Sequence, residues 1–94
     1  MNLPKTIIAF SENSESHSLF NAFAVSNGYI LQIKNKSVTL LASLLENRPE
    51  LILVEIHQPI MAEIEFVDQV HQFLPDIPIV IVSSFFYEIG RAHV

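Results

Sequence analysis

The stretch from Leu51 to Pro59 constrains the fold of this chain more than any other. Five of the six residues from Leu51 to Ile56 are aliphatic, and the exception is Glu55. An unbroken apolar run of this length is typical of a parallel strand that is buried on both faces. Open α/β sheets place their ligands beyond the carboxyl ends of such strands. We therefore expect Glu55 to lie at a functional position, followed by a turn at Pro59.

Three further apolar runs alternate with amphipathic segments around this strand. The predicted strands cover residues 6–10, 29–33, 51–56 and 79–82. The predicted helices run from the polar cluster at 11–15 to about Ser26, from Ser37 to near Asn47, and from about Ala62 to Leu74. Gly28 supplies a left-handed residue that ends the first helix. Strands that alternate with helices predict an α/β domain with a parallel sheet and right-handed crossovers.

The helical spacing of apolar residues predicts which face of each helix is buried. The predicted core residues of the first helix are Leu19, Phe20, Phe23 and Ala24, and those of the second are Val38, Leu41, Leu44 and Leu45. Those of the third helix are Ile64, Phe66, Val67, Val70, Phe73 and Leu74. On the opposite face of the third helix we expect Glu63, Glu65, Asp68, Gln69 and Gln72 to face water.

Composition and charge exclude several classes of function. The chain has 94 residues, enough for one domain, of which 50% are hydrophobic and 16% charged, a balance typical of globular proteins. Ten acidic and five scattered basic residues give a formal net charge of −5, without the basic patch that nucleic-acid binding requires. Two glycines are too few for a Gly-rich phosphate loop, and the lack of cysteine excludes disulfides and thiolate metal sites.

The apolar runs are also too short for a membrane protein. None approaches the roughly 20 residues of a membrane-spanning helix. The first residues of the chain lack the charged and apolar pattern of a signal peptide. We therefore expect a cytoplasmic protein that contacts no membrane and no nucleic acid.

Three segments carry the motifs of a known family. They are FSEN at 10–13, with NGY following at 27–29, PELILVEIHQP at 49–59, and PDIPIVIVSS at 75–84. In their order and spacing they resemble the receiver domains of two-component response regulators. The resemblance covers about residues 5–87. It implies a flavodoxin-like, doubly wound parallel sheet with strand order 2-1-3-4-5.

The resemblance also implies roles for single residues. In the receiver family an aspartate at the end of the third strand accepts a phosphoryl group, and here that position holds Glu55. The acid pair of the family corresponds to Ser11 and Glu12, and its hydroxyl switch position to Ser83. A magnesium ion would be held by Glu12, Glu55 and the backbone carbonyl of His57. The site thus departs from the family pattern at the acceptor and at one acid, and the family's lysine has no counterpart.

A degenerate receiver, or pseudo-receiver, is the function that these departures favour. The extra methylene of Glu55 moves its carboxylate by roughly 1 Å, and such a displacement can cost about 100-fold in rate. We therefore expect a non-enzymatic module of a two-component phosphorelay that acts through protein contacts and binds Mg²⁺ only weakly. Its expected partners are a histidine kinase or phosphorelay protein and an output or partner domain.

Other interpretations of the chain stay open. In one, Glu55 is a working phosphoacceptor that takes a phosphoryl group from a histidine kinase with the help of Mg²⁺. In another, the chain is a fragment of an unrelated doubly wound α/β enzyme. Glu55 itself either imitates the negative charge of a phosphorylated aspartate or is a strand-end residue with no role.

The last seven residues, 88–94, differ in character from the rest of the chain. They resemble the translation of a common sequencing-adapter oligonucleotide. We therefore interpret residues 1–87 as a partial receiver-like domain, truncated before the fifth strand, and residues 88–94 as a non-native tail. The strand at 79–82 would then be an exposed apolar edge, which predicts marginal stability or self-association.

Overall fold

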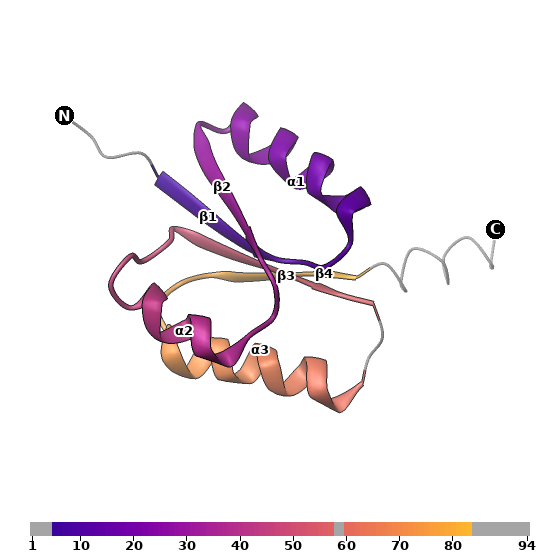
Figure 1. Ribbon diagram of the computed structural model, residues 1–94. Coiled ribbons are helices and arrows are strands. Elements are labelled where there is room, and N and C mark those ends of the chain that lie inside the picture. The colour runs from indigo at the N-terminus through magenta and orange to yellow at the C-terminus, as the bar shows by residue number, and fades with distance from the viewer. Residues whose placement is uncertain (1–4, 58–59, 84–94) are drawn as a thin grey trace.

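The computed structural model describes residues 5–57 and 60–83, in which strands and helices alternate (Figure 1). The strands are β1 (Lys5–Phe10), β2 (Tyr29–Lys34), β3 (Leu51–Ile56) and β4 (Ile79–Ser83), and the helices are α1 (Ser14–Ser26), α2 (Val38–Leu44) and α3 (Met61–Phe73). The predicted elements are confirmed, although α2 ends at Leu44 and not near Asn47. The predicted turn at Pro59 and the tail at 88–94 lie outside the described residues.

The sheet is parallel throughout, with the strands in the order β2-β1-β3-β4. Helix α1 covers one face of the sheet, and α2 and α3 cover the other (Figure 1). The chain therefore winds outward in both directions from its central strands, β1 and β3. This arrangement confirms the predicted doubly wound α/β class and is consistent with a flavodoxin-like fold. The winding reverses between the carboxyl ends of β1 and β3, which is where such folds bind ligands.

Alternate side chains of the central strands supply one apolar cluster to each face of the sheet. The larger cluster lies against α2 and α3 and consists of Ile8, Phe10, Leu41, Leu44, Ile52, Val54, Ile56, Phe66, Val70, Leu74 and Ile77. Within it, the rings of Phe10 and Phe66 meet edge to face with centroids 5.0 Å apart. The smaller cluster lies against α1 and consists of Ile7, Ala9, Phe20, Ala24 and Leu53. Strand β3 is therefore buried on both faces, as its apolar run predicts.

The predicted apolar face of α1 is only half buried. Phe20 and Ala24 are buried, whereas Leu19 and Phe23 are exposed. Among the described residues, α1 is the one helix on its face of the sheet (Figure 1), so no second helix packs against the flank that carries Leu19 and Phe23. The prediction that these two side chains belong to the core is wrong for that reason.

Helices α2 and α3 also bury narrower stripes than their sequences predict. Leu45 lies beyond the end of α2 and is exposed, as are Ile64 and Phe73 of α3. A helix on a sheet buries one stripe of side chains, and the flanking positions stay in contact with water. The prediction that Glu63 faces water is wrong as well, because its carboxylate is largely buried in a 2.7 Å ion pair with Lys36. No helix among residues 5–57 and 60–83 has the length and apolar character needed to cross a membrane.

Candidate functional site

Glu55 occupies the carboxyl end of β3 and is only 3% exposed. Strand β3 lies between β1 and β4, and Glu55 is the register partner of Val82 in β4. Its side chain follows the alternation of β3 to the face that Leu53 shares with α1. A charged group in such a place is costly unless its hydrogen bonds are made within the protein.

Two serine hydroxyls supply those hydrogen bonds. Ser11 Oγ donates to Glu55 Oε1 at 2.7 Å, and Ser16 Oγ donates to Glu55 Oε2. Each carboxylate oxygen thus has its own hydroxyl donor, one from the loop after β1 and one from α1. Hydrogen bonds to an ionised carboxylate are shorter and stronger than those between neutral groups. The two serines therefore provide both oxygens of the buried Glu55 carboxylate with hydrogen-bond donors from within the protein.

The loop after β1 places Ser11 beside Glu55. Ser11 follows the last residue of β1, and its backbone N–H donates to the carbonyl of Lys34 at 3.0 Å, so the sheet contact with β2 continues for one more residue. The backbone N–H of Asn13 donates to Ser11 Oγ at 3.3 Å, and the Asn13 side chain accepts from the N–H of Glu15 and so caps α1. The turn and the helix start therefore fix the hydroxyl that Glu55 accepts from.

Ser16 reaches Glu55 from the first turn of α1. It lies four and eight residues before Phe20 and Ala24, the two buried residues of that helix, so all three share one stripe toward the sheet. The N-terminus of a helix carries a partial positive charge that favours a nearby carboxylate. Helix α1 thus contributes both a hydroxyl and a favourable field to the position of Glu55.

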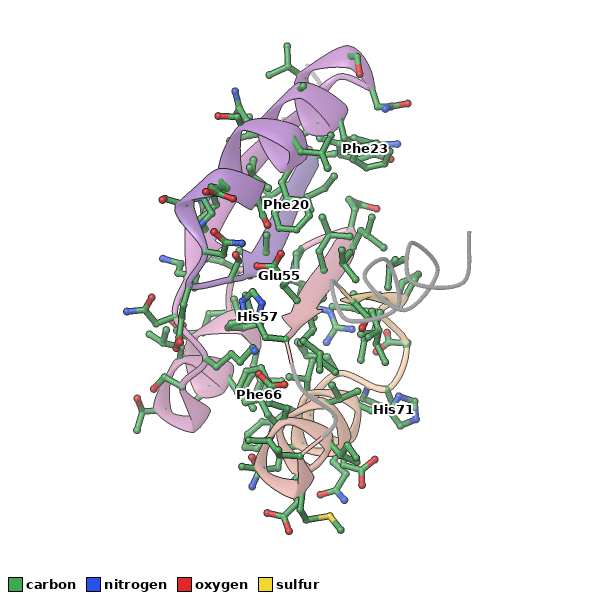
Figure 2. All side chains as sticks on the ribbon, turned by 90° about the vertical axis from the view of Figure 1, so that its right-hand side faces the viewer. Phe20, Phe23, Glu55, His57, Phe66 and His71 are labelled. Carbon is green, nitrogen blue, oxygen red and sulfur yellow. The ribbon has the colours of Figure 1, made fainter. Side chains whose placement is uncertain are left out.

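His57 lies on the solvent side of the site. Its Nε2 atom is 3.6 Å from Glu55 Oε1, and its side chain is 39% exposed. Figure 2 shows Glu55 between the ring of Phe20 on one side and His57 on the other. The predicted role of the His57 backbone carbonyl as a metal ligand stays a prediction.

Glu12 does not join Ser11 at the buried carboxylate. It is exposed and lines a surface hollow of about 330 Å³ together with Lys36, Glu63 and other residues of α3. Glu55 is not among the residues that line this hollow. The structure therefore brings together Ser11 and Glu55 of the predicted acid positions, and leaves Glu12 at the surface.

Ser83 ends β4 at the register position of Ile56, one residue past Glu55. Its hydroxyl oxygen is buried and has no hydrogen-bond partner within the described part of the chain. The same holds for His17 Nε2 in α1. A buried hydroxyl without a partner is uncommon, and the predicted switch role of Ser83 stays a prediction.

The arrangement of the acids suits internal hydrogen bonds better than a magnesium ion. Mg²⁺ needs near-octahedral oxygen ligands, usually one or two carboxylates with waters. Within residues 5–57 and 60–83 there is no cluster of three acidic or histidine side chains that could hold a metal, and both oxygens of Glu55 already accept hydroxyl hydrogen bonds. A cation at Glu55 would have to share the two carboxylate oxygens with the hydroxyls of Ser11 and Ser16. The residues therefore do not fit a preformed magnesium site, and weak binding stays a prediction.

Ser16 is the site residue that the sequence analysis missed. Its position gave a usable signal, because a polar residue one turn before Phe20 on a buried helical stripe must find a polar partner. The acid at the end of the neighbouring buried strand is the natural partner for it. The sequence does not give the angle of α1 across the sheet, and this angle decides whether Ser16 and Glu55 come within hydrogen-bond distance.

No protein-family model matches the chain, and no curated protein matches it. The resemblance to receiver domains therefore depends on the three motifs and on the architecture. The strand order and the place of Glu55 agree with that resemblance, but neither distinguishes a signalling domain from other doubly wound folds.

Proposed function

We propose that this chain is a receiver-like signalling domain of a two-component phosphorelay, of the pseudo-receiver kind, that acts through protein contacts. The proposal rests on one observation, the burial of Glu55 and the hydrogen bonds that its carboxylate accepts. This residue, which the resemblance assigns to the phosphoacceptor position, is 3% exposed and accepts a hydrogen bond at each carboxylate oxygen. An internal network thus fills the place where a receiver would accept a phosphoryl group.

The chemistry of phosphoryl transfer supports a degenerate site. The reaction needs an attacking oxygen in line with the leaving group, a divalent cation and further positive charge on the phosphoryl oxygens. Ser11 replaces one of the acids that would hold the cation, and its hydroxyl is bonded to Glu55. Ser16 donates to the other oxygen, so each oxygen of Glu55 that could attack a phosphoryl group already accepts a hydrogen bond from a hydroxyl.

The proposed partners follow from the proposed role. They are a histidine kinase or phosphorelay protein on the input side and an output or partner domain on the other, in the cytoplasm. Regulation would come from binding, since hydrogen bonds within the protein already engage both carboxylate oxygens of Glu55.

Incubation with acetyl phosphate and Mg²⁺, followed by intact-protein mass measurement, tests this function. We expect the unmodified protein to gain no phosphoryl group. The double variant Ser11→Asp/Glu55→Asp restores the family's acids at both positions and is expected to gain one, slowly, because the family's lysine still has no counterpart. The matched control Ser11→Asp/Glu55→Asn lacks the acceptor and should gain none.

Two results would count against the proposal. Phosphorylation of the unmodified protein that disappears in Glu55→Gln would make Glu55 a working acceptor. No phosphorylation of a folded Ser11→Asp/Glu55→Asp variant would remove the support for a receiver and favour an unrelated doubly wound protein.

A further inference from the structure

Strand β4 forms an edge of the sheet that lacks the usual protection against pairing. It pairs with β3, and no other strand of the described residues lies on its far side. Its sequence, Ile79-Val80-Ile81-Val82-Ser83, carries no charge. The opposite edge, β2, ends on Lys34. Charges on an edge strand discourage its pairing with another chain, so β2 is better protected against such pairing than β4.

The backbone of β4 presents hydrogen-bonding groups outward at alternate residues. The N–H of Ile52 in β3 donates to the carbonyl of Pro78 at 3.0 Å. In a parallel ladder the N–H and C=O of one residue point to the same side, and this side alternates along the strand. Val80 and Val82 therefore bond to β3, as Pro78 does. Ile79, Ile81 and Ser83 direct their N–H and C=O groups away from the sheet.

Exposed apolar side chains flank this edge on both faces of the sheet. Val80 is 45% exposed on the α1 face, and Ile81 is 52% exposed on the α3 face. Figure 2 shows Phe23 of α1 and His71 of α3 on the side of their helices where β4 lies. Ile64 lies on the same flank of α3 as His71, seven residues earlier and two turns away, and it is exposed too.

We propose that two copies of this chain associate through β4, paired antiparallel about a two-fold axis at Ile81. In this register Ile81 faces Ile81 of the partner subunit, and Ile79 faces Ser83 of the partner subunit. These are the residues whose backbone groups point outward, so each facing pair exchanges two hydrogen bonds. Val80 then packs against Val82 of the partner subunit on the α1 face. The two sheets become one continuous sheet.

The symmetry of the edge favours a second copy over another occupant. The outward groups lie at Ile81 and two residues to either side, so the strand is complementary to itself under a two-fold rotation. Two-fold interfaces use the same patch on both subunits, and an uncharged strand meets its copy without opposing like charges. When the two strands pair, the exposed side chains of Val80 and Ile81 are removed from water on the two faces of the sheet at once.

Analytical ultracentrifugation of the 94-residue protein over a wide range of concentrations tests this interface. We expect a reversible monomer–dimer equilibrium. Ile81→Lys places a positive charge directly opposite its copy and should raise the dimer dissociation constant by about 100-fold or more. The matched control is Ile30→Lys on β2, where the side chain is 48% exposed on the other edge. It should leave the dissociation constant within about threefold of the unmodified value.

Hydrogen exchange of the unmodified protein gives a second measurement that does not depend on how the variants fold. The amides of Ile81 and Ser83 should exchange slowly in concentrated solution and quickly on dilution, whereas those of Val80 and Val82 stay protected throughout. A monomer at all concentrations overturns the proposal, whether its Ile81 amide is protected by residues 84–94 or is free to exchange. Open-ended aggregates, or a dimer that Ile30→Lys breaks and Ile81→Lys does not, overturn it as well.

Discussion

The hydroxyl of Ser11 donates a 2.7 Å hydrogen bond to Glu55 Oε1 across two neighbouring parallel strands. Both residues are buried, and Ser11 also accepts from the backbone N–H of Asn13. One hydroxyl therefore joins the turn before α1 to the end of β3. This contact contributes to the stability of the fold. The effect of a substitution at the candidate site can therefore be measured as a change in the unfolding free energy, even when no partner is known.

Ser11→Ala should destabilise the protein by about 1–3 kcal/mol, because it leaves an oxygen of the buried Glu55 without its donor. Urea unfolding followed by circular dichroism measures this change. Ser26→Ala is the matched control, since the Ser26 hydroxyl bonds backbone carbonyls at the exposed end of α1, and it should change the unfolding free energy by no more than about 0.5 kcal/mol. Equal effects of the two substitutions would show that the hydrogen bond from Ser11 to Glu55 adds no more to the unfolding free energy than the exposed hydrogen bonds of Ser26 do.

Ser16 and Glu55 should be energetically coupled. In a double-mutant cycle with Ser16→Ala and Glu55→Gln, residues in one hydrogen-bond network show an interaction free energy of about 0.5–3 kcal/mol. Unfolding of the unmodified protein, the two single variants and the double variant in urea gives this value. The pair Ser43→Ala and Glu55→Gln is the control, because Ser43 bonds the Leu40 carbonyl on α2 and lies in another part of the fold. Additive effects for Ser16 and Glu55 would contradict the network.

Much of this fold could be predicted because the sequence patterns are strong and local. The apolar run of β3 predicted a strand buried on both faces, and Gly28, at φ 77°, ends α1 in the left-handed conformation that only glycine adopts easily. The alternation of strands and helices then leaves few topologies, because crossovers between parallel strands are right-handed. The place of Glu55 at the edge where β1 and β3 meet followed from the same pattern.

The errors arise where a residue's surroundings depend on distant parts of the chain. Leu19 and Phe23 have helical spacing with Phe20, but whether a flank of α1 is covered depends on what packs beside it. Glu63 has the spacing of a water-facing residue, yet it meets Lys36, 27 positions away in the sequence. Ser16 meets Glu55 in the same way, 39 positions away. Periodicity along one element contains no information on such contacts.

Lys36→Met should destabilise the protein by about 1–3 kcal/mol. The ion pair of Lys36 with Glu63 is 2.7 Å long, with side chains only 14% and 17% exposed. Its contribution therefore lies between that of exposed pairs, which is about 0–1 kcal/mol, and that of buried pairs, whose loss costs about 3–5 kcal/mol. Urea unfolding measures it, with Lys5→Met at an exposed position of β1 as the control. A loss no larger than that of the control would mean that water screens the pair.

Asp76 should make stability depend on pH in acid. A hydrogen bond from the Arg48 guanidinium, 2.6 Å away, holds the pKa of the Asp76 carboxyl below its usual value of 3.8. A lowered pKa means that the pair stabilises the folded protein above that value, and that this stabilisation disappears as the pH falls through the folded pKa. The stability difference between the unmodified protein and Asp76→Asn should therefore be present at neutral pH and smaller near pH 2. Urea titrations at both pH values test this, and added salt should reduce the difference at neutral pH because both side chains are exposed.

Phe20 and Phe23 should respond very differently to the same substitution, although both carry an aromatic ring on the same helix. Phe20 is buried against the sheet, and Phe20→Ala is expected to cost about 3–5 kcal/mol through lost burial and the cavity that remains. Phe23 is 47% exposed, so Phe23→Ala should cost about 1 kcal/mol or less. Urea unfolding at low protein concentration keeps any association through β4 out of the comparison. If Phe23→Ala cost as much as Phe20→Ala under those conditions, the flank of α1 that carries Phe23 would be covered in solution.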